Sequence, residues 1–276
     1  GRIFARGNLF SEDRENGTSL TNNGTYFRQA AAGLDISNET LGRFEFRSFL
    51  QAQVYDQTFS AVAADRNSET LSRLQRVPSQ SSGGSLFWTR DVGDHVIASS
   101  FELREVRGYS DEIGYFGGQP TSKTGSGGKE KTLAFFAQDL WKATERLSIS
   151  FGGRYDHWRN VDALSVTRTL STNAVAVTNF PDRGESAFSP RIAALVSINK
   201  HVSAYGSYSR SFRAPTLNEL YRGFRVGNVV TQSNENLCAE IANTFEGGIS
   251  LTTIQDRISL RGNVFQTQVS DPIVSI

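Results

Sequence analysis

The 276-residue chain has one cysteine, no methionine, only six prolines and no long apolar run. The single cysteine, Cys238, excludes a disulfide framework and any zinc site built from several cysteines. No segment approaches the ~18 consecutive apolar residues of a membrane helix, so a helical membrane protein is excluded. The 29 basic and 28 acidic residues nearly cancel. This balance removes the electrostatic footprint of a nucleic-acid-binding protein, and we expect no nucleic-acid partner.

The chain starts Gly1-Arg2-Ile3 in what reads as a strand, without a charged-then-apolar secretion signal. Together with the absence of methionine, this start predicts an internal fragment of a longer protein. The 25 glycines, 19 phenylalanines and 8 tyrosines indicate β-structure rather than collagen or disorder.

Apolar and polar residues alternate in three segments, 43–55, 147–156 and 258–264. A period of two is typical of a strand with two unlike faces. The alternation over 43–55 or 146–158 covers about 13 residues, or roughly 43 Å at ~3.3 Å per residue. A tilted strand needs about 35 Å to cross an outer membrane. These strands are therefore long enough to cross it and project beyond it.

Short and long connections alternate along the chain. Short turns are expected at 37–41, 92–95, 142–145, 199–201 and 253–256. Long polar connections are expected at 12–23, 57–80, 110–128, 161–185 and 213–243. This pattern predicts about eleven antiparallel strands with every long loop on one side, as in an up-and-down transmembrane β-barrel.

A repeat of fifty-odd residues also fits a propeller of the kelch type, and a soluble sandwich is a second alternative. Each repeat reads as two long strands rather than four short ones, which favours the barrel. Aromatic residues at strand ends agree with interfacial girdles, and they include Tyr55, Tyr109, Trp141 and Trp158.

The C-terminal half carries a set of short motifs in a fixed order. The strongest is Ser211-Phe212-Arg213-Ala214-Pro215, followed by Glu219-Leu220-Tyr221 and then by Asn234, Leu237 and Glu240. The other motifs, in chain order, are Gln138-Asp139-Leu140-Trp141, Gly153-Arg154-Tyr155-Asp156, Ser189-Pro190-Arg191 and Glu246-Gly247-Gly248. Together these motifs resemble the barrel of TonB-dependent outer-membrane receptors. Two departures from the family pattern fall in the expected outer loop, where Glu235 stands in place of the usual proline and Cys238-Ala239 in place of a basic-proline pair.

The resemblance implies a 22-stranded barrel in the bacterial outer membrane with an N-terminal plug inside it. It also implies import of a scarce small-molecule or glycan ligand, such as a ferric siderophore, haem, cobalamin or a glycan. Energy would come from the TonB–ExbB–ExbD complex through the plug. Residues 1–276 would form a partial barrel of about 11 strands, without the plug, the early strands and the C-terminal strands.

Catalytic, metal and cofactor sites are not expected. His95, His157 and His201 lack metal-ligand spacing and read as surface or interfacial histidines. Segment 125–129 resembles a phosphate loop but lacks its spacing and a following helix. Because no cluster supplies an acid, a base or a nucleophile, we expect no enzyme.

Arg213 has two interpretations. It could face the lumen and meet an anionic ligand or the plug, since arginine pairs with carboxylates in a bidentate manner. It could instead complete an inward polar ladder with Glu219 or Glu246. Ligand capture is expected from aromatic and arginine residues of two loops. These residues are Tyr109, Tyr115 and Phe116 in one loop, and Tyr221, Arg222, Phe224 and Arg225 in the other.

Three functions therefore remain open from the sequence. The first is energy-coupled import by a TonB-dependent receptor. The second is a passive porin-like barrel, and the third is a soluble β-rich binding domain.

Overall fold

A computed structural model describes residues 1–226, 229–252 and 258–274. In this part of the chain, 12 strands form one antiparallel sheet, and a two-stranded hairpin and a short helix lie beside it. The elements are β1 (Arg2–Thr18), β2 (Thr21–Asn38), β3 (Gly42–Val62), β4 (Glu69–Val92), β5 (His95–Phe116), β6 (Gln119–Lys142), β7 (Leu147–Thr169), β8 (Val175–Asn179), β9 (Arg183–Asn199), β10 (Val202–Arg213), α1 (Leu217–Tyr221), β11 (Phe224–Val226), β12 (Val229–Thr231), β13 (Glu240–Thr252) and β14 (Ser259–Ser270).

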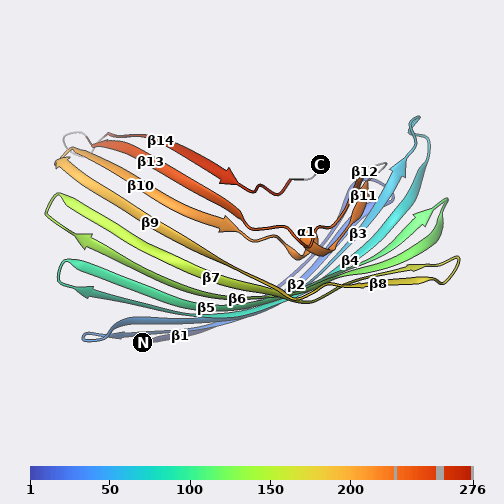
Figure 1. Cartoon of the computed structure of the whole chain (residues 1–276), viewed down its shortest axis with the longest axis horizontal. Coiled ribbons are helices and arrows are strands. Elements are labelled where there is room, and N and C mark those ends of the chain that lie inside the picture. The colour runs from blue at the N-terminus through green and yellow to red at the C-terminus, as the bar shows by residue number, and fades with distance from the viewer. Residues whose placement is uncertain (227–228, 253–257, 275–276) are drawn as a thin grey trace.

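The sheet is a curved, open wall in which strands follow one another in chain order (Figure 1). Its continuous path contains eleven strands, from β1 at one edge to β14 at the other, and β8 branches from β7. The expectation of about eleven antiparallel strands is thus confirmed for the described residues. Helix α1 and the β11–β12 hairpin lie in the hollow of the wall (Figure 1). No helix in the described ranges has the length and apolarity needed to span a membrane.

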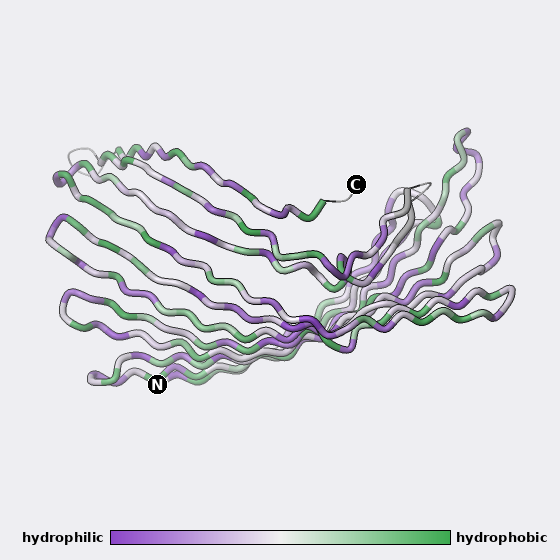
Figure 2. Tube along the Cα trace, in the orientation of Figure 1, coloured by the Kyte–Doolittle hydropathy of each residue, from purple (hydrophilic) through white to green (hydrophobic). Residues whose placement is uncertain are grey.

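One face of the sheet, here called the outer face, carries a continuous apolar row. Seven cross-strand partners make up the row, namely Leu34, Phe46, Leu86, Phe101, Phe135, Tyr155 and Phe188. All but Leu34 are 43–56% exposed. Exposed aromatic rings in register across so many strands match the lipid-facing band of an outer-membrane barrel. The alternation behind this row is visible as changing hydropathy along each strand (Figure 2).

The opposite, inner face carries the polar residues of the same strands. Arg154 on β7 contacts Glu102 on β5 through both terminal nitrogens at 2.9 Å, and its Nε donates to Asp156 at 2.9 Å. Such bidentate pairs are the stronger kind of charged hydrogen bond. Period-two alternation thus separates a lipid-facing side from a polar side.

Most of the expected long loops are strands. The connections that remain are 19–20, 63–68, 117–118 and 170–174, because β1 to β7 continue as paired hairpins through the polar segments. The expectation of long loops at 12–23, 57–80, 110–128 and 161–185 was therefore wrong. The backbone N–H and C=O groups of polar residues form the same interstrand hydrogen bonds as those of apolar residues. A strand can therefore continue where the alternation of apolar residues stops. The expected short turn at 253–256 lies outside the described residues.

The two strand-end tryptophans differ in their surroundings. Trp141 lies at the short-turn rim and stacks on His95 with ring centroids 5.8 Å apart, which fits an interfacial girdle. Trp158 is only 3% exposed and stacks on Phe212 at 5.0 Å. Its assignment to a girdle was wrong, because its strand position points it to the inner face.

Three inner-face glycines pair directly with an aromatic residue of the neighbouring strand. Phe4 pairs with Gly33, Phe49 with Gly83 and Tyr205 with Gly248. In each pair, a Cβ atom on the glycine would come within 2.3–2.7 Å of a ring carbon. The rings therefore occupy the space that a side chain would fill, an arrangement that helps to fix strand register.

Candidate functional site

The segment between β10 and β13, residues 214–239, is here called the connector. Strand β10 pairs with β9 only from Val202 to Ser209. Beyond this point the chain leaves β9 and crosses the inner face, where Phe212 stacks on Trp158 of β7. Helix α1 then contacts β6 and β7. The expected outer loop 213–243 thus folds, for the part described, against the inner wall.

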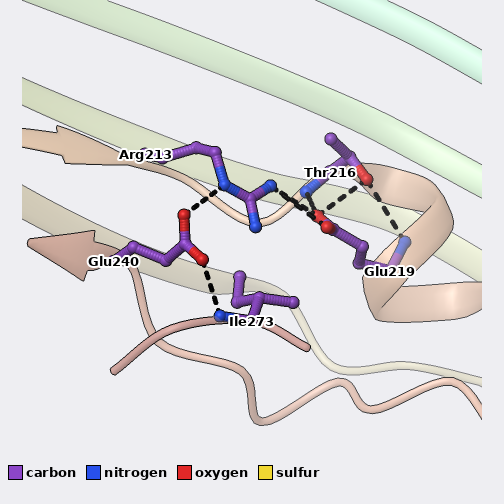
Figure 3. Close-up of polar contacts among 5 residues, drawn as sticks. All are labelled: Arg213, Thr216, Glu219, Glu240 and Ile273. Carbon is purple, nitrogen blue, oxygen red and sulfur yellow. Dashed lines mark hydrogen bonds and ion pairs between the residues drawn. The ribbon is translucent and has the colours of Figure 1, made fainter. Parts of the chain in front are cut away.

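The start of the connector is fixed by a chain of charged hydrogen bonds (Figure 3). The Thr216 hydroxyl and the Glu219 carboxylate form a capping box at the N-terminus of α1. Arg213 donates to Glu219 at 3.0 Å and, through Nε, to Glu240 at 2.5 Å. The other oxygen of Glu240 accepts the Ile273 N–H at 2.6 Å. Arg213 therefore joins β10, α1 and β13, as the interpretation with Glu219 as its partner predicts.

Beneath α1 lies a small apolar core. Leu220 and Tyr221 are at most 1% exposed and pack with Ala163 of β7. The Tyr221 ring contacts Phe180 with centroids 4.9 Å apart. Leu237, from the far end of the connector, packs against the same cluster. The motif residues Leu220 and Leu237 are therefore the apolar anchors of the connector.

A buried charge cluster holds the end of α1 to the wall. Arg222 donates to Glu112 of β5 at 2.6 Å, and Arg73 of β4 lies 3.4 Å from the other oxygen of Glu112. Arg73 also lies over the Phe59 ring, 4.1 Å from its centroid. The side chains of all three charged residues are at most 14% exposed. Glu112 therefore offsets two guanidinium groups in a poorly solvated place, which makes it the central residue of the cluster.

The last part of the connector is held to the wall through its backbone carbonyl groups. Arg183 at the start of β9 donates to the carbonyl oxygens of Glu235 and of Leu237, the latter at 2.7 Å. The N–H of Asn234 donates to the Glu219 carbonyl at 3.2 Å. Glu235 and Cys238, which depart from the family pattern, lie in this stretch, and Cys238 is exposed.

The expected ligand residues fall into separate places. Phe116 is 84% exposed at the β5–β6 turn, and Tyr115 precedes it. Tyr109 lies on the outer face, 5.5 Å from the Arg107 guanidinium. Tyr221 is buried and Arg222 is paired with Glu112, so neither is at a loop tip. Phe224 and Arg225 belong to β11, but their side chains lie outside the described part of the structure.

Sequence reasoning missed Glu112, Arg73 and Arg183, residues of the wall that hold the connector, and it assigned Trp158 to the wrong face. Arg222 and Glu112 are 110 residues apart, and no local pattern joins them. Strand parity alone could have placed Glu112 on the inner face. Among the described residues, no group of three or more metal-ligating side chains is present.

The family described as TonB dependent receptor-like, beta-barrel matches residues 2–276. A TonB-dependent heme receptor A of Haemophilus influenzae (strain KW20/Rd) is 25% identical over 196 residues, which cover 70% of this chain and 25% of that protein. The homologous receptor of strain 86-028NP is also 25% identical, with the same coverage. The chain therefore spans about a quarter of the length of the curated relatives it matches.

Solved structures with the same fold include the ferric yersiniabactin uptake receptor FyuA from Yersinia pestis. Its TM-score is 0.71 at 13% identity, and the match covers 94% of this chain and 38% of FyuA. The ferripyoverdine receptor of Pseudomonas aeruginosa gives a TM-score of 0.65 at 15% identity, and the match covers 97% of this chain and 39% of that receptor. Proteins of this family are outer-membrane transporters rather than enzymes. By its sequence match and by its fold, the chain belongs to the TonB-dependent receptor β-barrel family.

Proposed function

We propose that the protein containing this barrel wall imports a scarce ligand through the outer membrane with energy from the TonB–ExbB–ExbD complex. The observation that carries this proposal is the connector, which lies in the hollow of the wall and is held there by Arg222–Glu112 and Arg213–Glu219 contacts. A segment fastened across the inner face narrows the passage. This arrangement suits a gated importer better than an open porin.

The ligand that we propose to test first is an iron-carrying one, either haem or a ferric siderophore. The support is that the curated relatives are named as haem receptors and that two of the similar structures are named as receptors for ferric yersiniabactin and ferripyoverdine. Cobalamin and glycans are the alternatives. The exposed Phe116 and its neighbour Tyr115 offer aromatic surface for the first contact. Tyr221 and Arg222 would reach a ligand only after the connector moved.

Growth on a defined iron source tests the proposal. A strain that lacks the full-length receptor should fail to grow on haem, or on the matching ferric siderophore, as sole iron source. The plasmid-borne receptor should restore growth, and deletion of tonB should abolish it again. Uptake that continues without TonB would instead support the passive porin. Recovery of the receptor in the aqueous fraction without detergent would support the soluble binding domain.

A further inference from the structure

The outer face contains a groove of about 1110 Å³ that crosses the sheet from β1 to β7. Pockets that hold small ligands measure roughly 300–1,000 Å³, so this groove is large. Its floor includes Ala30, Ala32 and Gly84, and three exposed leucines rise beside it, Leu50, Leu103 and Leu133. Apolar side chains therefore line a hollow on the side of the barrel that faces lipid.

Basic residues border the groove on the side away from the apolar row. Lys131 and Arg159 line it directly and are cross-strand partners. Arg107 and Lys129 are partners in the next row, two residues further along their strands, which is about 7 Å. Arg28 of β2 belongs to the same row as Arg107. Cross-strand pairing connects the two, because Arg28 pairs with Ala52, Ala52 with Gln80, and Gln80 with Arg107. These five residues are here called the basic rim.

The basic rim has more positive charge than its carboxylates offset. Lys129 pairs with Asp162 at 2.7 Å, Lys131 lies 3.9 Å from Glu105, and Arg159 lies 3.6 Å from Asp182. Arg28 and Arg107 form no ion pair with any described residue. Exposed ion pairs contribute little free energy, so their cations can exchange a carboxylate for another anion at small cost. Phosphate accepts several charged hydrogen bonds from Arg and Lys at once.

The order of the rows fits one class of molecule. The Phe46–Leu86–Phe101–Phe135 row lies on one side of the groove, and the basic rim lies on the other. The rim lies toward the ends of the strands that project beyond the apolar band, and in such barrels these ends face the exterior. An occupant thus needs an apolar tail directed into the membrane and an anionic head at the outer surface.

We propose that this groove binds a phosphorylated glycolipid of the outer leaflet, with an acyl chain along Leu50, Leu103 and Leu133 and phosphates at the basic rim. Cations in two rows about 7 Å apart, on several strands spaced by about 4.8 Å, suit a head group with more than one phosphate. A glycerophospholipid offers a single phosphate to the same surface. The inference depends only on membrane insertion and not on the ligand that the receptor transports.

Lipid binding to the delipidated full-length receptor tests this inference. The three probes are diphosphorylated lipid A, dephosphorylated lipid A and phosphatidylglycerol. Each is titrated in matched detergent micelles, and the bound lipid is counted by native mass spectrometry. The double variant Arg107→Gln/Lys131→Gln removes charge from the rim. Ala32→Phe fills the groove without a change of charge. Arg90→Gln is the control, because Arg90 lies on the same face near the short-turn rim. Heat-modifiable migration verifies that each variant is folded.

The expected result is that wild type and Arg90→Gln bind diphosphorylated lipid A at least tenfold more tightly than the other two probes. Arg107→Gln/Lys131→Gln should lose this preference and bind the diphosphorylated and dephosphorylated forms alike. Ala32→Phe should weaken the binding of both lipid A forms severalfold. Unchanged binding in the double variant, or equal binding of phosphatidylglycerol by the wild type, would overturn the assignment and leave only general lipid contact.

Discussion

At the scale of single residues, Glu69 shows how one carboxylate can tie two hairpins together. It lies beyond the apolar rows, at the outer end of β4, and accepts hydrogen bonds from the Ser19 hydroxyl at 3.0 Å and from the Leu20 N–H at 3.2 Å. The Ser60 hydroxyl, with Thr18, Ser19 and Leu20, lowers the pKa of Glu69 to about 2. A carboxylate whose pKa is lowered in the folded protein contributes its full stabilisation above pH 4.5, the ordinary pKa of glutamate. This stabilisation is lost as the pH falls toward 2.

We therefore predict that the Leu20 amide stays protected from hydrogen exchange between pH 4.5 and 7 and loses protection as the pH approaches 2. Glu69→Gln should lower its protection between pH 4.5 and 7, where the wild-type carboxylate is charged, because the amide cannot carry the charge. As the pH approaches 2 the difference between the two proteins should disappear. Glu15→Gln, at an exposed position of β1, is the control. The same protection of Leu20 in Glu69→Gln and in the wild type between pH 4.5 and 7 would contradict the role of Glu69.

Arg213 allows a test between its two interpretations. Its side chain is 43% exposed, and exposed ion pairs contribute about 0.2–1 kcal/mol each. Arg213→Ala should therefore leave the barrel assembled and make the connector more sensitive to protease, with cleavage mapped by mass spectrometry. Loss of ligand uptake with a connector that remains protected would favour the direct ligand role instead.

At the scale of elements, the connector depends on the cluster of Glu112, Arg73 and Arg222. Removal of one partner from a buried ion pair costs about 3–5 kcal/mol, because a charge is left without compensation. Glu112→Gln leaves two guanidinium groups, whereas Arg222→Ala leaves Glu112 paired with Arg73. We predict that hydrogen exchange of residues 217–222 rises more in Glu112→Gln than in Arg222→Ala. The reverse order would show that Arg222 acts through other contacts.

The strands could be predicted from the sequence where apolar and polar residues alternate with a period of two. The segment 147–156 predicted the core of β7, but the strand continues to Thr169 because its polar residues also pair. The connector could not be placed, since its partners Glu112 and Arg183 lie far away in sequence. The motif 211–221 was recognised correctly as a motif. What it does locally, to fasten α1 to the wall, depends on residues that the motif does not contain.

At the scale of the whole molecule, the edges of the sheet limit what residues 1–276 can do alone. Strands β1 and β14 each have one neighbour within the described sheet. An open edge exposes backbone N–H and C=O groups that lipid cannot satisfy, at several kcal/mol for each group. We predict that a polypeptide of residues 1–276 alone does not insert stably into bilayers. Protease-resistant, heat-modifiable insertion of this polypeptide would contradict the prediction, and the full-length receptor is the control.

The glycine partners of Phe4, Phe49 and Tyr205 have a consequence for the width of the passage. A ring that occupies the place of a missing Cβ lies along the wall instead of projecting across the hollow. The inner face thus carries large aromatic residues without narrowing the bore at these strands. In the proposed importer, clearance for a bulky solute would then be set by the connector rather than by these aromatic residues of the wall.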